Sequence, residues 1–142
     1  MELGKDITAE DLPEQLDFFS GWEEKYGYII DLGTSLTTLP ESAYIDDNLV
    51  KGCQSQVWIT YKKSADNRYV FRVDSDALIV KGLLAIILIA YNYKTAEEIL
   101  AFNIEDYFAK LDLLKHISNV RGNGLRAMVA RIQAIAQTDK HS

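Results

Sequence analysis

The chain has 142 residues, of which 48% are hydrophobic and 25% charged, and its formal net charge is −6 at pH 7. A chain of this length buries about two-thirds of its unfolded surface, so it needs neither a disulfide nor a metal to fold. The negative charge excludes nucleic acid and anionic membranes as main partners, because phosphate groups are bound by basic surfaces. One cysteine excludes an internal disulfide, and the first residues show no signal peptide. We therefore expect a cytoplasmic protein with a single domain over residues 1–142.

Two helices are predicted near the N-terminus. The first lies within residues 8–22, where Thr8 is expected to be the N-cap. The second spans residues 22–36, because its apolar side chains recur at the spacing of one helix face. Gly33 is expected to end or bend this second helix, and a loop that contains Pro40 follows it.

A small antiparallel sheet is predicted in the middle of the chain. Apolar and polar residues alternate with a period of two in residues 56–61 and again in residues 68–73. The residues between them, 62–67, are rich in turn formers, so the two runs predict a β-hairpin with a longer loop. A third strand is expected around residues 49–51, which makes a sheet of about three strands.

The rest of the chain is predicted to be helical. Residues 76–92 are apolar on nearly every side but too short to span a membrane, so we expect a buried central helix. Thr95 and Glu98 have the spacing of a capping box and predict the start of a short helix. Further helices are predicted at residues 103–113 and 124–137. Along the chain, helices thus precede and follow a small antiparallel sheet, an order that predicts an α+β fold.

Cys53, the only thiol, lies where the loop meets the hairpin. Gly52 before it gives the backbone freedom and leaves space beside the thiol, and Gln54 and the two residues after it are polar but uncharged. A cysteine kept for packing more often lies among apolar residues, although a small side chain filling a strand end is the simpler interpretation. Thiolate is the nucleophilic form, and Lys51 would favour it if its side chain turned toward Cys53.

The segment KGCQSQVWI around Cys53 closely resembles the active-loop motif of the SufE family of sulfur-acceptor proteins. The segments WEEKYGYIIDLG, DSDALIVKGLLAIIL, TAEEILAFN and HISNVRGNGLRAM follow in the family's order, so the resemblance covers nearly the whole chain. A sister branch, the CsdE type, has Gly-Cys-Glu-Asn-Arg-Val-Trp at the loop, which places this chain nearer the SufE branch. The resemblance implies a SufE/IscU-like fold.

The resemblance also implies a function. Members of the family accept sulfur from a pyridoxal-phosphate cysteine desulfurase of the SufS or CsdA type and deliver it to an iron–sulfur scaffold such as the SufBCD complex. By resemblance, Cys53 is the acceptor that becomes a persulfide, on a loop that is sheltered at rest and swings outward. The protein is then a sulfur-relay partner and not a stand-alone enzyme, with no cofactor or metal of its own. The oligomeric state stays open between a monomer and a homodimer.

Two further positions carry over from the family. Asp76 matches the second aspartate of an Asp-Ser-Asp segment near the cysteine loop, and the alternative is an N-cap for the central helix. Arg121 matches the arginine of a Ser-Arg-x-x-Gly-Leu segment that faces the desulfurase. Here Val120 replaces the serine and Gly122 loosens the predicted helix start, so a surface arginine without a partner is the alternative.

Two other classes of function are compatible with the residues. A stand-alone thiol enzyme, either a hydrolase or a thiol peroxidase, would use Cys53 with His116 or Arg121. A plain interaction domain would carry an inert cysteine. The length and specificity of the Gly-Cys-Gln-Ser-Gln-Val-Trp motif favour the sulfur acceptor over both.

Overall fold

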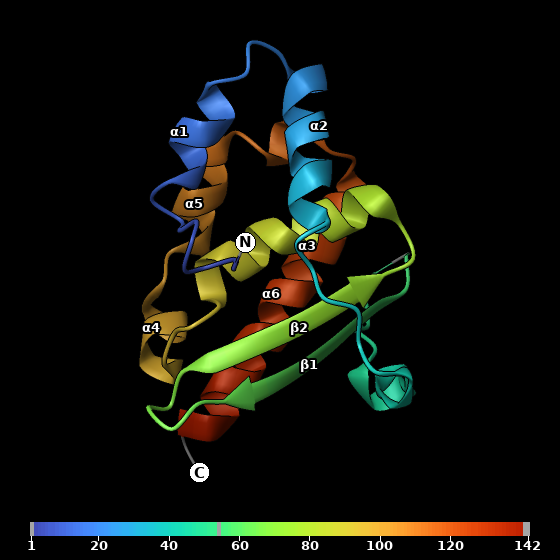
Figure 1. Cartoon of the computed structure of the whole chain (residues 1–142), viewed down its shortest axis with the longest axis vertical. Helices are drawn as coiled ribbons and strands as arrows, with labels where there is room; N and C mark the ends of the chain where they lie inside the picture. Colours follow the sequence, from blue (N-terminus) through green and yellow to red (C-terminus); the bar gives the residue numbers. More distant parts are fainter. Residues whose placement is uncertain (1, 54, 141–142) are drawn as a thin grey trace.

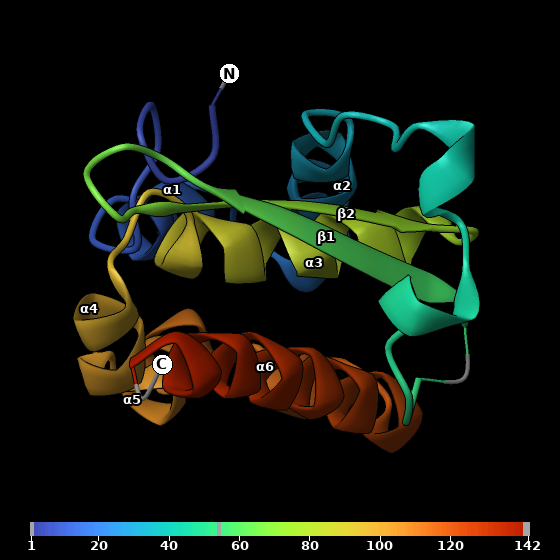
Figure 2. The same ribbon diagram turned by 90° about the horizontal axis from the view of Figure 1, so that it is seen from below.

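The computed structural model describes residues 2–53 and 55–140. The described part holds six α-helices, two strands and three 3-10 turns. In chain order these elements are α1 (Leu12–Asp17), α2 (Trp22–Gly33), η1 (Glu41–Ala43), η2 (Asp46–Asn48), β1 (Val57–Lys63), β2 (Tyr69–Ser75), α3 (Leu78–Tyr91), α4 (Ala96–Ala101), α5 (Ile104–Leu111), η3 (Leu114–His116) and α6 (Asn119–Lys140). The hairpin and α3 lie side by side, and α6 forms a second layer below them (Figure 2). The predicted α+β class is confirmed.

The central helix is buried, as its composition predicts. Every residue from Gly82 to Tyr91 is buried, and Ile86 and Ile87 are 0% exposed. A helix that is apolar on all sides gains free energy only if every side is covered, and α2, β2 and α6 all contact it. Among the described residues, none of the helices has the length and hydropathy that crossing a membrane requires.

The crossing of α2 over α3 depends on two glycines. A Cβ atom at Gly82 would overlap the carbonyl oxygen of Ile29, and one at Gly33 would lie 2.8 Å from the backbone nitrogen of Gly82. The backbones of α2 and α3 therefore approach more closely than they could if either glycine carried a side chain. The expectation that α2 ends at Gly33 is confirmed, and close packing against α3 explains the glycine at this position.

The hairpin is confirmed, but the third strand is wrong. β1 and β2 pair antiparallel from Val57 opposite Ser75 to Lys63 opposite Tyr69. Residues 49–51 contribute an isolated bridge between Leu49 and Trp58 and one hydrogen bond, so the sheet in the described part of the chain has two strands. The chain turns at residues 51 and 52, where Gly52 has φ of +92°, and so leaves the ladder after Val50.

Two helix starts differ from their predictions. α1 begins at Leu12 and not at Thr8, because the Thr8 amide and hydroxyl both donate to the Asp11 carboxylate and hold residues 8–11 in a turn. α6 begins at Asn119, five residues before the predicted start at Gly124. Ser118 accounts for this, since its hydroxyl oxygen accepts a hydrogen bond from the Arg121 amide and caps the helix. The Thr95–Glu98 capping box at α4 is confirmed.

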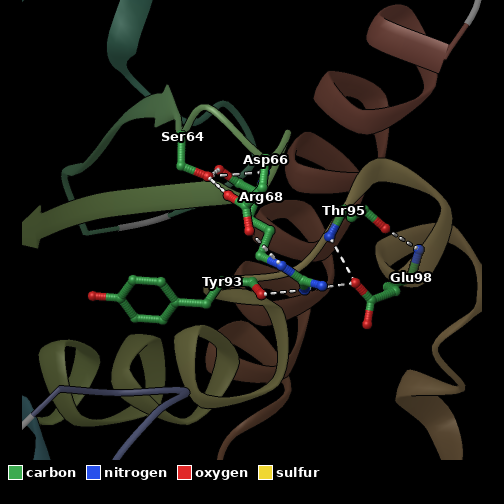
Figure 3. Close-up of polar contacts among 6 residues, drawn as sticks. All are labelled: Ser64, Asp66, Arg68, Tyr93, Thr95 and Glu98. Atoms are coloured by element: carbon green, nitrogen blue, oxygen red, sulfur yellow. Dashed lines mark hydrogen bonds and ion pairs between the residues drawn. The ribbon is translucent and has the colours of Figure 1, made fainter.

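A set of polar residues fastens the hairpin turn to α4; we call it the Arg68 cluster, and it comprises Ser64, Asp66, Arg68, Tyr93, Thr95 and Glu98 (Figure 3). The Arg68 guanidinium donates to the Asp66 carboxylate at 3.0 Å, to the Tyr93 carbonyl at 3.0 Å and to the Glu98 carboxylate at 2.9 Å. Glu98 also accepts from the Thr95 amide within the capping box. One guanidinium therefore joins the β-turn, the end of α3 and the start of α4.

Candidate functional site

Cys53 opens into a cavity of about 270 Å³ between three parts of the chain. The described residues between η2 and β1, which we call the Cys53 loop, form one wall. The first turns of α3 form an apolar second wall, and the first turns of α6 form the third. Figure 2 shows that β1 and α6 begin at the same end of the molecule. The lining residues are Cys53, Ser55, Val57, Val80, Leu83, Leu84, Ser118, Val120, Arg121, Gly124 and Leu125.

Two glycines let the Cys53 loop lie against α6. Gly52 has φ of +92°, which side chains other than glycine rarely adopt, and a Cβ there would lie 3.2 Å from the Cβ of Ala127. Gly124 lies beside the thiol: the Cys53 Sγ is 3.6 Å from the Gly124 carbonyl oxygen and can donate to it, and a Cβ at position 124 would be in ordinary van der Waals contact with Sγ. Cys53 is thus half-buried, and within the described residues its thiol makes one weak hydrogen bond.

The base of the Cys53 loop is anchored to the sheet and to α6. The Val50 amide donates to the Val57 carbonyl at 2.8 Å. The Arg131 guanidinium donates to the Asp47 carbonyl at 2.6 Å and to the Leu49 carbonyl at 3.3 Å. Sequence reasoning missed Arg131, because nothing local pairs a helix residue with a loop more than 80 positions away. These contacts hold the base of the loop, on the N-terminal side of Cys53.

The electrostatic surroundings of Cys53 favour the thiol over the thiolate. Burial raises the pKa of the Cys53 thiol, because a charged sulfur is poorly solvated in the cavity. Lys51, the cation expected to favour the thiolate, is exposed and is not among the residues that line the cavity. Gln54 lies outside the described residues. At rest, therefore, the sulfur is kept in its less reactive form.

Of the two positions taken from the family resemblance, the structure brings one to the cavity. Arg121 lines it from the first turn of α6, and the Ser118 cap below it supplies the helix start that Val120 and Gly122 were expected to weaken. Asp76 is exposed and does not line the cavity. The interpretation of Asp76 as an N-cap is wrong: Ala77 occupies the N-cap position of α3, and its side chain makes no capping bond.

Asp74, two positions before Asp76, makes side-chain contacts with two other segments of the chain. Its carboxylate accepts from the Tyr44 hydroxyl at 2.6 Å and pairs with Lys81 at 3.3 Å. Burial acts to raise the pKa of Asp74, but the hydrogen bond from Tyr44, that from the Ser75 amide and the charge of Lys81 together lower it. Asp74 therefore joins the end of β2 to the segment that leads into the Cys53 loop and to α3.

A cysteine–histidine pair does not form in the described part of the chain. His116 stacks on Trp22 with ring centroids 4.0 Å apart, and its Nε2 lies 3.3 Å from the Asp112 carboxylate. It does not line the cavity of Cys53. Over the same residues, no group of three or more His, Cys, Asp or Glu side chains gathers where it could hold a metal ion.

Comparison with known proteins bears on both the family and the fold. The family model SufE, described as an Fe-S metabolism associated domain, matches residues 10–136. The solution structure of a hypothetical protein from Thermus thermophilus superposes with a TM-score of 0.76 over 94% of this chain and 96% of that chain, at 15% sequence identity. At that identity the second match shows a shared fold, which agrees with the α+β arrangement of the described residues.

Proposed function

The chain belongs to the SufE family of Fe–S metabolism associated domains, and on that premise we propose that it accepts sulfur from a pyridoxal-phosphate cysteine desulfurase. Cys53 is the acceptor, and residues 1–142 act as one functional domain. The observation that carries the proposal is that the only thiol of the chain opens into a cavity. A desulfurase of the SufS or CsdA type is the donor, and an iron–sulfur scaffold of the SufBCD type receives the sulfur next.

The transfer is a thiol–persulfide exchange. The Cys53 thiol loses its proton, and the thiolate attacks the outer sulfur of the persulfide on the desulfurase cysteine. The sulfur–sulfur bond of the donor breaks, a new one forms on Cys53, and the desulfurase cysteine leaves as a thiolate that takes up a proton. No external oxidant or reductant is needed, because the outer sulfur keeps its oxidation state.

The contacts of Cys53 suit both a resting and a loaded state. The cavity, at about 270 Å³, leaves room for a second sulfur atom beyond Sγ and shelters it from other thiols. The apolar wall formed by Val80, Leu83 and Leu84 offers that sulfur no reactive group. Because burial raises the pKa of the thiol, we propose that docking of the desulfurase draws the Cys53 loop away from α6 and so makes the thiolate accessible.

Sulfur loading tests the proposal directly. The protein is mixed with L-cysteine and a desulfurase of either type, and its intact mass is read without reductant. We expect the mass of one or more sulfur atoms to be added at Cys53 and removed by dithiothreitol. Loading that persists in Cys53→Ser would overturn the assignment, and loading by only one donor type would identify the partner.

Binding and chemistry are separated by a second pair of variants. Cys53→Ser keeps the size of the side chain but loses the nucleophile, so it should bind the desulfurase normally and fail to accelerate cysteine turnover. Arg121→Ala should weaken binding if Arg121 contacts the partner, and Arg126→Ala, on the same helix but paired with Glu105, is its matched control. Full stimulation by Cys53→Ser would make the protein a conformational activator and not a sulfur relay.

A further inference from the structure

The net charge of the chain is concentrated in one segment. Residues 10–31, which contain α1, α2 and their connection, have seven acidic side chains and one lysine, a balance of −6. The remaining residues have fourteen acidic and fourteen basic side chains and are neutral as a set. The whole formal charge of −6 therefore resides in this segment. Its acidic residues, all exposed, are Glu10, Asp11, Glu14, Asp17, Glu23, Glu24 and Asp31.

These seven carboxylates differ from the others in their partners. Within residues 2–53 and 55–140, none of the seven forms an ion pair, whereas eight of the other fourteen do. Asp11 and Glu24 accept hydrogen bonds from neighbouring Thr8 and Ser20, which carry no charge. Unpaired like charges on one segment repel each other, and a basic surface relieves that repulsion.

The same segment exposes an aromatic cluster. Phe18, in the connection between α1 and α2, is 85% exposed, more than any other large hydrophobic residue described. Its ring meets that of Phe19 edge-on at 5.6 Å, and Phe19 lies 5.2 Å from Tyr28 on α2. Together with Glu14 and Gln15, these rings line a shallow hollow of about 300 Å³. Figure 1 shows this connection at the top of the molecule.

The cluster is held in place by a bond between the two helices. The Tyr28 hydroxyl donates to the side-chain oxygen of Gln15 on α1 at 2.7 Å. The hollow is therefore a fixed surface between two helices. An exposed aromatic residue beside a fixed hollow and surrounded by charge is the arrangement found at protein–protein interfaces, where one buried anchor supplies most of the affinity.

From these observations we propose that the α1–α2 surface, defined as Glu14, Gln15, Phe18, Phe19 and Tyr28 with the seven carboxylates around them, docks a partner protein. The partner presents lysines or arginines around an apolar side chain that packs against Phe18. Nucleic acids and anionic membranes are repelled by the same carboxylates. The hollow shares no lining residue with the Cys53 cavity, so this surface is separate from the site of sulfur transfer and its test does not depend on that function.

The probe is a short amphipathic peptide in which lysines flank a strip of leucines. Titrated into isotope-labelled protein, it should shift the amide signals of residues 10–31 and leave those around Cys53 in place. Binding should weaken as salt rises, because the rim charges are exposed. Phe18→Ser should weaken it by about tenfold, as expected for an aromatic anchor. The double variant Glu14→Gln/Asp17→Asn should weaken it less and flatten the salt dependence.

Two matched controls fix the location of binding. Leu78→Ser removes another large exposed hydrophobic residue, 69% exposed, and Glu41→Gln/Asp46→Asn removes two exposed carboxylates outside the segment. Both should bind the peptide like the parent protein. Phe18 is so exposed that its replacement leaves the fold intact, which thermal melts verify.

Four outcomes would overturn the proposal. The first is equal binding of a peptide with glutamates in place of the lysines, and the second is a set of signal shifts outside residues 10–31. The third is concentration-dependent self-association that Phe18→Ser abolishes, which would make a second copy of the chain the occupant. The fourth is binding to phosphatidylglycerol vesicles that depends on Phe18, which would make a lipid surface the occupant.

Discussion

At its turn, the β-hairpin is fastened to α4 by the Arg68 cluster, whereas at its open end Arg131 anchors the base of the Cys53 loop and Cys53 itself rests on α6 through one weak hydrogen bond among the described contacts. Arg68 makes three charge-assisted or polar bonds at 2.9–3.0 Å. Among the described contacts, Cys53 makes one bond through sulfur at 3.6 Å, and Gly52 lies close enough to α6 that a Cβ there would be 3.2 Å from the Cβ of Ala127. Moving the turn breaks several bonds together, whereas moving Cys53 away from α6 breaks, among the described contacts, one weak hydrogen bond.

The helix α3 joins the two ends. Its first turns line the Cys53 cavity, and the residues after its last turn, Asn92 and Tyr93, bond to β2 and to Arg68. The turn end of the hairpin is thus anchored to the residues that follow α3. The first turns of the same helix form the apolar wall of the Cys53 cavity at the open end of the hairpin. The turn is thus the firmly bonded end of the hairpin, and the movement of the Cys53 loop that we propose would take place at the opposite end.

The largest expected effect comes from the shared helix. Ile87→Ala, in the middle of α3 and 0% exposed, should lower the free energy of unfolding by about 2–5 kcal/mol. Leu84→Ala should cost a similar amount, but Leu84 lines the Cys53 cavity, so it should also speed reaction of the thiol with Ellman's reagent. Urea melts and thiol kinetics distinguish the two. An unchanged melt for Ile87→Ala would show that α3 does not support both ends.

A smaller effect is expected at the hairpin turn. Arg68→Ala leaves the Tyr93 carbonyl and Glu98 without their donor and should destabilise the fold by about 1–2 kcal/mol, limited by the partial exposure of the cluster. Arg72→Ala, on the exposed face of β2, is the matched control and should change stability by about 0.5 kcal/mol or less. Neither should alter the reactivity of Cys53. A faster thiol reaction in Arg68→Ala would mean that the two ends are not independent.

Substitutions of two glycines in α6 test how the helix contacts Cys53 at the open end of the hairpin. Gly124→Ala and Gly122→Ala should each stabilise α6 by about 0.5–1 kcal/mol, because alanine favours the helix and neither Cβ meets a clash. Only the Cβ at position 124 lies near the thiol, 3.6 Å from Sγ. Thiol modification should therefore slow in Gly124→Ala alone. Equal rates in the two variants would place the thiol outside the cavity.

The smallest effect is on the pH dependence of stability. Burial raises the pKa of Cys53 in the folded state above its unfolded value, so the fold prefers the neutral thiol. The stabilisation is complete below the unfolded pKa and is lost as pH rises through the folded pKa. The difference in stability between the parent and Cys53→Ser should shrink over this alkaline range, measured by urea melts at several pH values. A constant difference would contradict a buried thiol.

Much of the fold could be predicted because it follows from local patterns. The alternation that buries Tyr69, Phe71 and Val73, the apolar run of α3 and the Thr95–Glu98 box each use residues only a few positions apart. The errors also have local causes. The Thr8 hydroxyl donates to the Asp11 carboxylate within the turn before α1, and Ser118 caps α6 earlier than its apolar pattern begins.

The candidate site was predictable only in part, because its walls come from distant segments. The motif around Cys53 identified the thiol and Gly52, and the family resemblance pointed to Arg121. Gly124 as the acceptor of the thiol and Arg131 as the anchor of the loop depend on how α6 packs. No pattern within a window of neighbouring residues records contacts that join positions more than 70 apart.

The cavity around Cys53 also depends on the order in which the chain is made. Cys53, Ser55 and Val57 contribute to one of its walls and Val80, Leu83 and Leu84 to another, but the third comes from the start of α6 and from Ser118 just before it. Domains are synthesised from the N-terminus, so a ribosome-bound chain that ends before residue 118 already carries its only thiol and lacks the wall that shelters it. Protection of the sulfur therefore arises with the last helix, and an incomplete chain is the form of this protein most open to oxidation.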